Sequence, residues 1–278
     1  MFHRFALRAL LAASLLVVPG LARAAGPADE IAAALDLPEV FEIMGAEGAA
    51  YGTELETQMF PGAGGRNWAA EVSRIYATDR ILPIFYKSFE AELQASHADT
   101  GAILDFFRSD LGRQVIELEV SARRALLDPS VEEASRLRLD ELRVERPPRL
   151  AQVERFIAAN DLIEANVASA LNANYAFYQG LAGAGGPFRD MTDDDILREV
   201  WSQEDQVREE TDSWMTAYLA LAYAPIGNDD LDRYIAFSET APARDLNRAL
   251  FAAYDAVFVD VMDRLGQAAA AILAGQDL

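Results

Sequence analysis

The chain has 278 residues, of which 51% are hydrophobic and 25% are charged, so a fully disordered or collagen-like chain is excluded. Its formal net charge of −21 argues against nucleic acid as a partner, because phosphate binding needs a basic face. The lack of cysteine in the sequence excludes a disulfide scaffold, a thiolate metal site and a cysteine nucleophile.

Residues 1–24 have the features of a secretory signal peptide. Arg4 and Arg8 precede an apolar stretch over residues 9–18, which is shorter than a membrane span, and Ala22-Arg23-Ala24 has the small-x-small pattern of a cleavage site. We predict cleavage after Ala24, no integral membrane segment in the mature chain, and a periplasmic location. An N-terminal membrane anchor is the alternative.

The rest of the sequence predicts helices. Apolar residues recur at helical spacing almost throughout, and the alternation typical of strands is nearly absent. Asp128-Pro129 indicates a helix start, with aspartate as N-cap and proline in the first turn. Pro147-Pro148 interrupts a charged run and is the best candidate for a domain boundary. We therefore predict an all-α fold divided into a signal peptide (1–24) and two helical bundles (25–146 and 147–278).

The two predicted bundles resemble each other in sequence. Residues 60–65 and 181–186 are both rich in glycine, and residues 103–106 parallel residues 234–237. The offset between the second pair is larger by about ten residues, and we expect a longer helix around Trp201 to Trp214 in the second copy to absorb them at little cost. We predict a tandem repeat of similar topology.

Neither glycine run is preceded by a strand or followed by Lys-Ser/Thr, so flexible connections are favoured over a nucleotide loop.

A short motif lies within residues 103–113, where Phe106, Ser109 and Gly112 follow the spacing Phe-x-x-Ser-x-x-Gly. The segment resembles the hallmark of a bacterial exported family, domain of unknown function 2059. In that family an apolar helix runs into Phe-Tyr-x-Ser-Pro-x-Gly, and a second long helix follows. Here Phe107 replaces the tyrosine and Asp110 replaces the proline. The family has no established activity, so the resemblance implies an exported helical protein but no chemistry.

A weaker second copy of this motif follows in the second half. Phe237 aligns with Phe106, Thr240 stands for the serine and Ala243 stands for the glycine. Together the two motif regions cover about a fifth of the chain, which is fewer residues than a domain of ordinary length contains.

The residue types of the motif predict a structural role for it. Ser109 can cap the following helix through its hydroxyl, and Asp110 suits the positive end of the helix dipole. Gly112 lacks a side chain, so another helix could cross closely there. Phe106 and Phe107 would anchor the corner, each contributing about 2–3 kcal/mol if fully buried.

The mature chain would keep one histidine, His97, in a polar connection between two helices. One histidine excludes a histidine-pair zinc site. A general base held by Asp99 is the functional interpretation, and a solvated loop or C-terminal cap is the favoured structural one. We predict no catalytic histidine.

Carboxylates are too numerous to identify a site by counting. A hydrolytic pair needs a defined separation and one raised pKa, and Glu71 and Glu90, near aromatic helix faces, are the first to check. Residues 193–195 and 229–230 are runs of aspartate that could gather a hard cation, but both lie where helices should start. Thr192 with Asp195 resembles a capping box. We predict no metal and no cofactor.

Aromatic residues concentrate in the second half and are the weak candidates for a ligand groove. Tyr and Trp can line such a groove because they combine apolar area with a polar tip. Helical spacing suits core packing of the same residues equally well. The candidates are Tyr175, Tyr178, Trp201 and Trp214.

Three functions remain open on the sequence alone. The first is a non-enzymatic binding or structural module of the cell envelope that engages a protein or peptide partner. The second is a small-molecule or lipid carrier, favoured if the aromatic set lines a cavity. The third is a carboxylate-dependent hydrolase, which requires two acids converging in a cleft.

Overall fold

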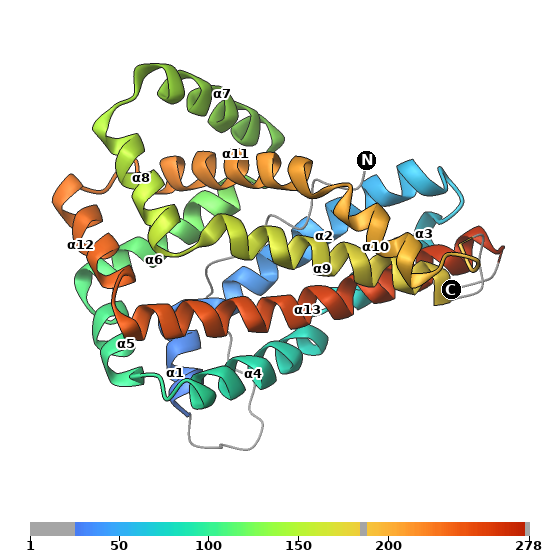
Figure 1. Cartoon of the computed structure of the whole chain (residues 1–278), viewed down its shortest axis with the longest axis horizontal. Coiled ribbons are helices and arrows are strands. Elements are labelled where there is room, and N and C mark those ends of the chain that lie inside the picture. Colours follow the sequence, from blue (N-terminus) through green and yellow to red (C-terminus); the bar gives the residue numbers. More distant parts are fainter. Residues whose placement is uncertain (1–25, 184–187, 276–278) are drawn as a thin grey trace.

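The computed structural model describes residues 26–183 and 188–275, and every secondary-structure element in these ranges is a helix (Figure 1). The predicted all-α fold is confirmed. The predicted signal peptide and most of the second glycine run lie outside the described residues. The helices are α1 (Pro27–Ala34), α2 (Leu37–Met59), α3 (Gly65–Ile75), α4 (Thr78–Ala95), α5 (Thr100–Phe107), α6 (Asp110–Ala125), α7 (Pro129–Glu145), α8 (Pro148–Ala159), α9 (Leu162–Gly183), α10 (Asp193–Trp201), α11 (Glu204–Ala222), α12 (Asn228–Ser238) and α13 (Ala241–Leu273).

Several helices begin where their capping residues predict. The Asp128 carboxylate accepts a hydrogen bond from the backbone N–H of Ser130 at the start of α7. Thr192 and Asp195 form the predicted capping box of α10, each side chain accepting from the other's backbone N–H. Both aspartate runs lie in the first turns of helices, where acids complement the helix dipole.

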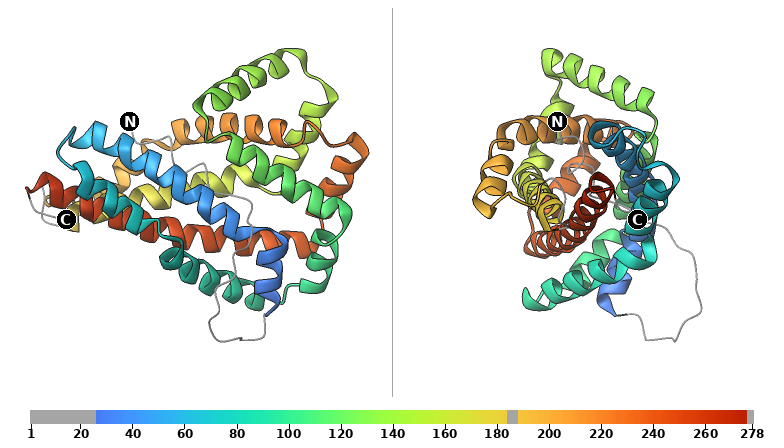
Figure 2. Two further views of the ribbon diagram at one scale, coloured as in Figure 1. Left: turned by 180° about the vertical axis from the view of Figure 1, so that it is seen from behind. Right: turned by 90° about the vertical axis from the view of Figure 1, so that its right-hand side faces the viewer.

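The long helix α13 is the axis of the molecule and packs along α9 (Figure 2). Two glycines permit their close approach. A Cβ atom added to Gly180 would lie 2.1 Å from the carbonyl oxygen of Asp263, and one added to Gly266 would lie 2.2 Å from that of Phe177. Because these neighbours are backbone atoms, neither glycine can be replaced without separating the two helices.

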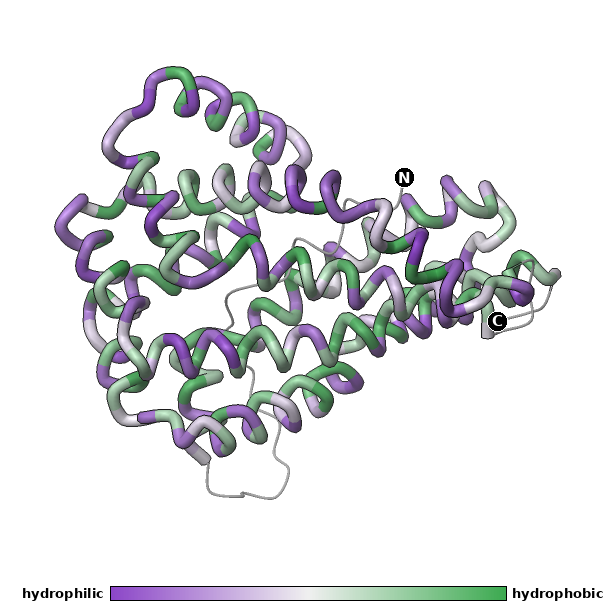
Figure 3. The backbone as a smooth tube through the Cα atoms, viewed as in Figure 1, coloured by the Kyte–Doolittle hydropathy of each residue, from purple (hydrophilic) through white to green (hydrophobic). Residues whose placement is uncertain are grey.

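The two halves of the chain share one core. A single cluster of buried apolar side chains includes Phe41 and Phe85 from the first half and Tyr254 from the second, with ring centroids 4.9–5.9 Å apart. In Figure 3, hydrophobic residues accordingly recur along α4, α9 and α13. Division into two tandem bundles at Pro147-Pro148 therefore remains a prediction. The extra residues expected around Trp201 to Trp214 do not form one longer helix, because α10 ends at Trp201 and α11 begins at Glu204.

Helix α7 lies on the outside of the bundle, across α11 (Figure 1). Its buried Leu139 packs with Leu150 and Ala217 in a small cluster separate from the main core. Arg143 of α7 also donates to Asp212 of α11 over 2.7 Å. Val131, in the first turn of α7, packs against the main core, so α7 is held near both of its ends. No helix in the described ranges is both long enough and apolar enough to cross a membrane.

We predict that Gly266→Ala lowers the free energy of unfolding by about 2–3 kcal/mol, because the new methyl group meets the α9 backbone. Gly45→Ala, in the interior of α2 with open space around its Cα, is the matched control and should stabilise the chain by about 0.5–1 kcal/mol. Urea unfolding followed by circular dichroism measures both. Equal effects of the two substitutions would contradict the close-contact interpretation.

Candidate functional site

The repeated motif forms two helix corners of the same construction. In the first, the Ser109 hydroxyl donates to the Phe106 carbonyl over 2.6 Å and accepts from the Gly112 N–H over 3.0 Å. In the second, Thr240 makes the equivalent bonds with the Phe237 carbonyl and the N–H three residues on, over 2.7 and 3.4 Å. The structure confirms that Ser109 caps α6.

The two corners lie against each other. The rings of Phe106 and Phe237 stack with centroids 3.7 Å apart and an angle of 3° between their planes. Phe107 is buried and meets Phe237 edge-on, whereas Phe106 is half-buried. A Cβ atom on Gly112 would lie 2.1 Å from the Phe106 carbonyl oxygen, so the glycine accommodates the end of α5 and not a crossing helix. These contacts make the motif a structural joint between the two halves.

The predicted aromatic set does not form one groove. Tyr178 is buried in the core, with its hydroxyl 3.5 Å from Gln203 Nε2. Tyr175 is partly buried, and its hydroxyl accepts from Gln179 on the same helix. Trp201 is 60% exposed at the end of α10, and Trp214 stacks on a buried tyrosine of α11. The carrier hypothesis, which needed a cavity lined by this set, loses its main support.

The other sequence candidates also separate. His97 is exposed in a left-handed conformation (φ 52°) just after α4, the expected C-terminal cap position. Asp99 caps α5 by accepting from the Ala102 N–H, so it does not hold an imidazole. Glu71 is bonded to Arg74 one turn away. No group of three or more metal-ligating side chains occurs in the part of the chain that the structure describes.

A buried polar cluster at the centre of the molecule was not predicted. Glu119 of α6 is fully buried, and its Oε1 accepts from the Tyr223 hydroxyl over 2.5 Å. The backbone carbonyl of Glu119 accepts from the Tyr218 hydroxyl over 3.1 Å. One turn along α6, fully buried Arg123 donates through Nε and Nη2 to both carboxylate oxygens of Glu47.

Burial changes the acidity of this cluster. Desolvation raises the pKa of Glu119 to about 7, and hydrogen bonds from Tyr223 and Tyr234 oppose the rise. Burial, reinforced by the nearby Glu119 carboxylate, holds the pKa values of Tyr218, Tyr223 and Tyr234 well above their ordinary value. The tyrosines therefore stay protonated donors at any physiological pH.

The adjoining core cavity is too small for a substrate. It has a volume of about 40 Å³ and is lined by Tyr218 and Tyr234 among mainly apolar residues. Such a volume accommodates water-sized molecules, whereas substrate pockets are roughly 300–1,000 Å³. Glu119 is not among the residues that line it, and Glu47 is engaged by Arg123. The buried carboxylates are thus parts of the core, and the arrangement gives the hydrolase hypothesis no reaction site.

Two surface grooves are large enough for a ligand. The α1–α6 groove, of about 710 Å³, lies between α1, the end of α5 and α6. Its cations are engaged with acids: Arg108 bonds to Glu30 and Arg124 bonds to Glu39. Charges already paired in this way provide little attraction for a charged ligand.

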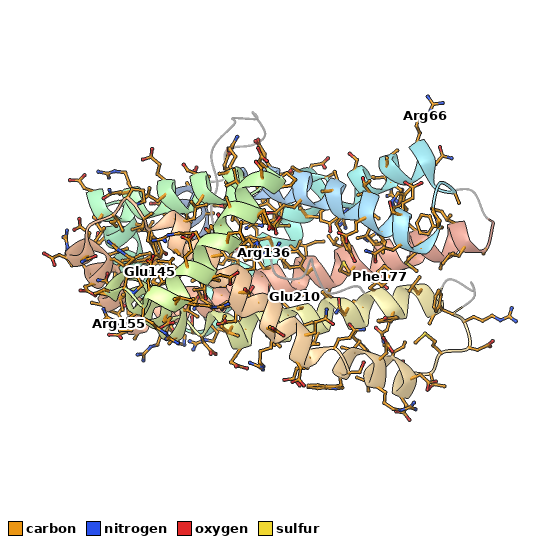
Figure 4. The ribbon with its side chains drawn as sticks, turned by 90° about the horizontal axis from the view of Figure 1, so that it is seen from above. Arg66, Arg136, Glu145, Arg155, Phe177 and Glu210 are labelled. Carbon is orange, nitrogen blue, oxygen red and sulfur yellow. The ribbon has the colours of Figure 1, made fainter. Side chains whose placement is uncertain are left out.

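The α7–α11 groove, of about 740 Å³, lies between α7 and α11, with one residue from α2 and one from the end of α6. It has five glutamates and one arginine, and that arginine, Arg136, is bonded to Glu133 of its own helix. Figure 4 views this region from above, with Arg136 and Glu210 marked. The lining residues are Glu54, Leu126, Pro129, Glu132, Glu133, Ser135, Arg136, Gln206, Glu209, Glu210, Ser213, Trp214, Ala217 and Tyr218.

Two polar atoms of the α7–α11 groove have no hydrogen-bond partner among the described residues. They are Oε2 of Glu210, an acceptor, and Nε1 of Trp214, a donor. Both side chains belong to α11 and are four residues apart, so they share one helix face. A buried polar atom without a partner costs about 1–3 kcal/mol. Of the four predicted aromatic candidates, Trp214 is the one that lines this groove.

Comparison of the chain with family models, with curated proteins and with solved structures finds no match. The resemblance to the exported family therefore remains a prediction.

We predict that ionisation of Glu119 makes the fold less stable as pH rises. The pKa of Glu119 in the folded chain, about 7, lies above its ordinary 4.5, so the folded state binds this proton more tightly. The free energy of unfolding of the natural chain, relative to Glu119→Gln, should fall by about 3 kcal/mol between pH 4.5 and 8.

Urea unfolding at several pH values measures this difference. Glu117→Gln, at an exposed position of the same helix, removes the same charge and serves as the control. The effect of net charge on stability cancels in this comparison. A constant difference between the natural chain and Glu119→Gln across the pH range would show that burial does not raise this pKa.

We predict that Phe106→Ala and Phe237→Ala are energetically coupled. Each single substitution should cost about 2 kcal/mol, and the double mutant should cost about 1 kcal/mol less than their sum, because the stacked pair is already lost in either single variant. The pair Phe106→Ala and Phe60→Ala is the control, since Phe60 packs on Trp68 elsewhere in the core. Additivity in both cycles would refute the joint between the corners.

Proposed function

We propose that this chain is an exported, non-enzymatic binding protein of the cell envelope that holds a protein or peptide partner in the α7–α11 groove. The single observation that carries the proposal is this groove of about 740 Å³, whose lining residues Glu210 and Trp214 each have a solvent-shielded polar atom without a partner. Grooves of this size bury most of a ligand's surface.

The way α7 is attached supports a binding role. Val131 holds its first turn against the main core, Leu139 and Arg143 hold its C-terminal half, and its first turns line the groove. An outer helix with a single buried residue can move at lower cost than the helices of the main core. Export is supported by the composition of residues 1–24, and the net charge of −21 supports a partner other than nucleic acid.

The proposal is tested on the full chain expressed with its own first residues in a bacterium that has a periplasm. We expect the periplasmic fraction to contain a chain that begins after Ala24, and native mass spectrometry to show a bound peptide. Trp214→Ala should abolish that adduct without unfolding the chain, whereas Trp201→Ala should retain it.

Two results would contradict the proposal. Retention of the unprocessed chain in the cytoplasm would contradict export. An adduct that survives Trp214→Ala would place binding elsewhere on the molecule.

A further inference from the structure

The negative charge of the α7–α11 groove is not neutralised by its hydrogen bonds. Gln58 donates to Glu54 over 2.9 Å and Gln206 donates to Glu210 over 3.0 Å. A neutral amide satisfies a carboxylate oxygen but leaves its charge in place. With Arg136 already bonded to Glu133, the groove retains a negative potential that attracts cations and repels anions.

The floor of the groove is aromatic. Trp214 stacks on Tyr218 with ring centroids 5.2 Å apart and an angle of 17° between the planes. The face of an indole is the strongest aromatic partner for an ammonium or guanidinium group. Tyr218 is in turn fixed by its hydrogen bond to the buried carbonyl of Glu119. Tyr218 is therefore a fixed support for the indole of Trp214.

The two unpartnered atoms distinguish among cations. Glu210 Oε2 needs a donor, and Trp214 Nε1 needs an acceptor, on the same face of α11. A polyamine offers donors but no acceptor. A basic peptide offers both, because its side chain is a cationic donor and its backbone carbonyl is an acceptor. Both atoms are shielded from solvent, so a rotation of each side chain would bring them to the ligand.

Resting on the proposed binding role of this groove, we propose that its ligand is an extended peptide segment rich in arginine or lysine. One basic side chain lies over Trp214 and donates to Glu210, and a neighbouring peptide carbonyl accepts from Trp214 Nε1. Glu209, on the same wall as Glu210, attracts a further basic residue.

The test measures binding of a fluorescent peptide of alternating arginine and alanine to the mature full chain by anisotropy. Counterparts with glutamine or glutamate in place of arginine, and competition by spermine, complete the set. We expect the arginine peptide to bind, more weakly at higher salt, and the glutamine and glutamate peptides not to bind. Spermine should compete at least about tenfold less well, because it offers no acceptor.

Variants locate the binding. Glu209→Gln with Glu210→Gln should weaken the arginine peptide at least about tenfold. Asp105→Asn with Glu154→Gln removes the same charge from exposed positions outside the groove and should change binding less than about twofold. Trp214→Phe keeps an aromatic face but loses the N–H, so it should weaken the peptide about fivefold and spermine less than about twofold. Circular dichroism confirms that each variant is folded.

Each contrary result overturns this inference in a recognisable way. No binding of the arginine peptide, or an equal loss in both double variants, would show that the groove does not select cations. Spermine that binds as tightly as the peptide would make a free polyamine the ligand. A glutamine peptide that binds and depends on Trp214 would overturn the ligand class while leaving the proposed binding function intact.

Discussion

The contact between the backbones of α9 and α13 is the constraint on which the rest of the structure depends. Gly180 and Gly266 let the two helices touch through main-chain atoms, and any side chain at either position would separate them. Helix α13 also packs on α4, and α9 carries α10 and α11 on its other side. The position of α11, and with it one wall of the α7–α11 groove, therefore depends on this contact through α9, together with the packing of α11 on α6 and α8.

The buried charges of α6 impose a second constraint. They determine which helices pack around α6, whereas the two glycines determine how closely α9 and α13 approach. Removing one partner from a buried ion pair costs about 3–5 kcal/mol, because the other charge stays buried. Arg123 thus requires Glu47 of α2, and Glu119 requires hydroxyl donors from α11 and α12. An alternative packing of α11 would leave Glu119 without its donors. The polar cluster contributes specificity, while its ionisation lowers stability as pH rises.

The sequence predicts local features well because they depend on neighbouring residues. Helical periodicity, the Asp128 and Thr192 caps and the corner at Ser109 all follow from interactions within a few positions. The buried charges could also have been found, since Glu119 and Arg123 occupy the same helical stripe as Val115, Ile116 and Val120. A charge at a core position of an amphipathic helix indicates a buried partner.

The groove was beyond prediction because its residues come from four helices that meet only in the folded chain. Nothing near Glu54 in sequence indicates that it faces Glu209, and the aromatic spacing of Trp214 fits a core residue equally well. Tertiary packing decides which exposed acids converge. Tertiary packing also decides which aromatic candidates are buried: Tyr178 lies in the core, whereas Trp201 lies on the surface.

The distribution of arginine shows how an acidic chain can concentrate charge at one place. Many acids have an arginine three residues away on their own helix, as Asp110 has Arg113, Asp230 has Arg233 and Asp245 has Arg248. In the groove, Glu133 has such a partner in Arg136, whereas Glu54 and Glu210 are bonded to the amides of Gln58 and Gln206, each four residues away. Arginine in place of Gln206 would neutralise the charge of Glu210 within a single helical turn. The use of an amide there keeps the hydrogen bond while preserving the negative potential that a basic ligand would require.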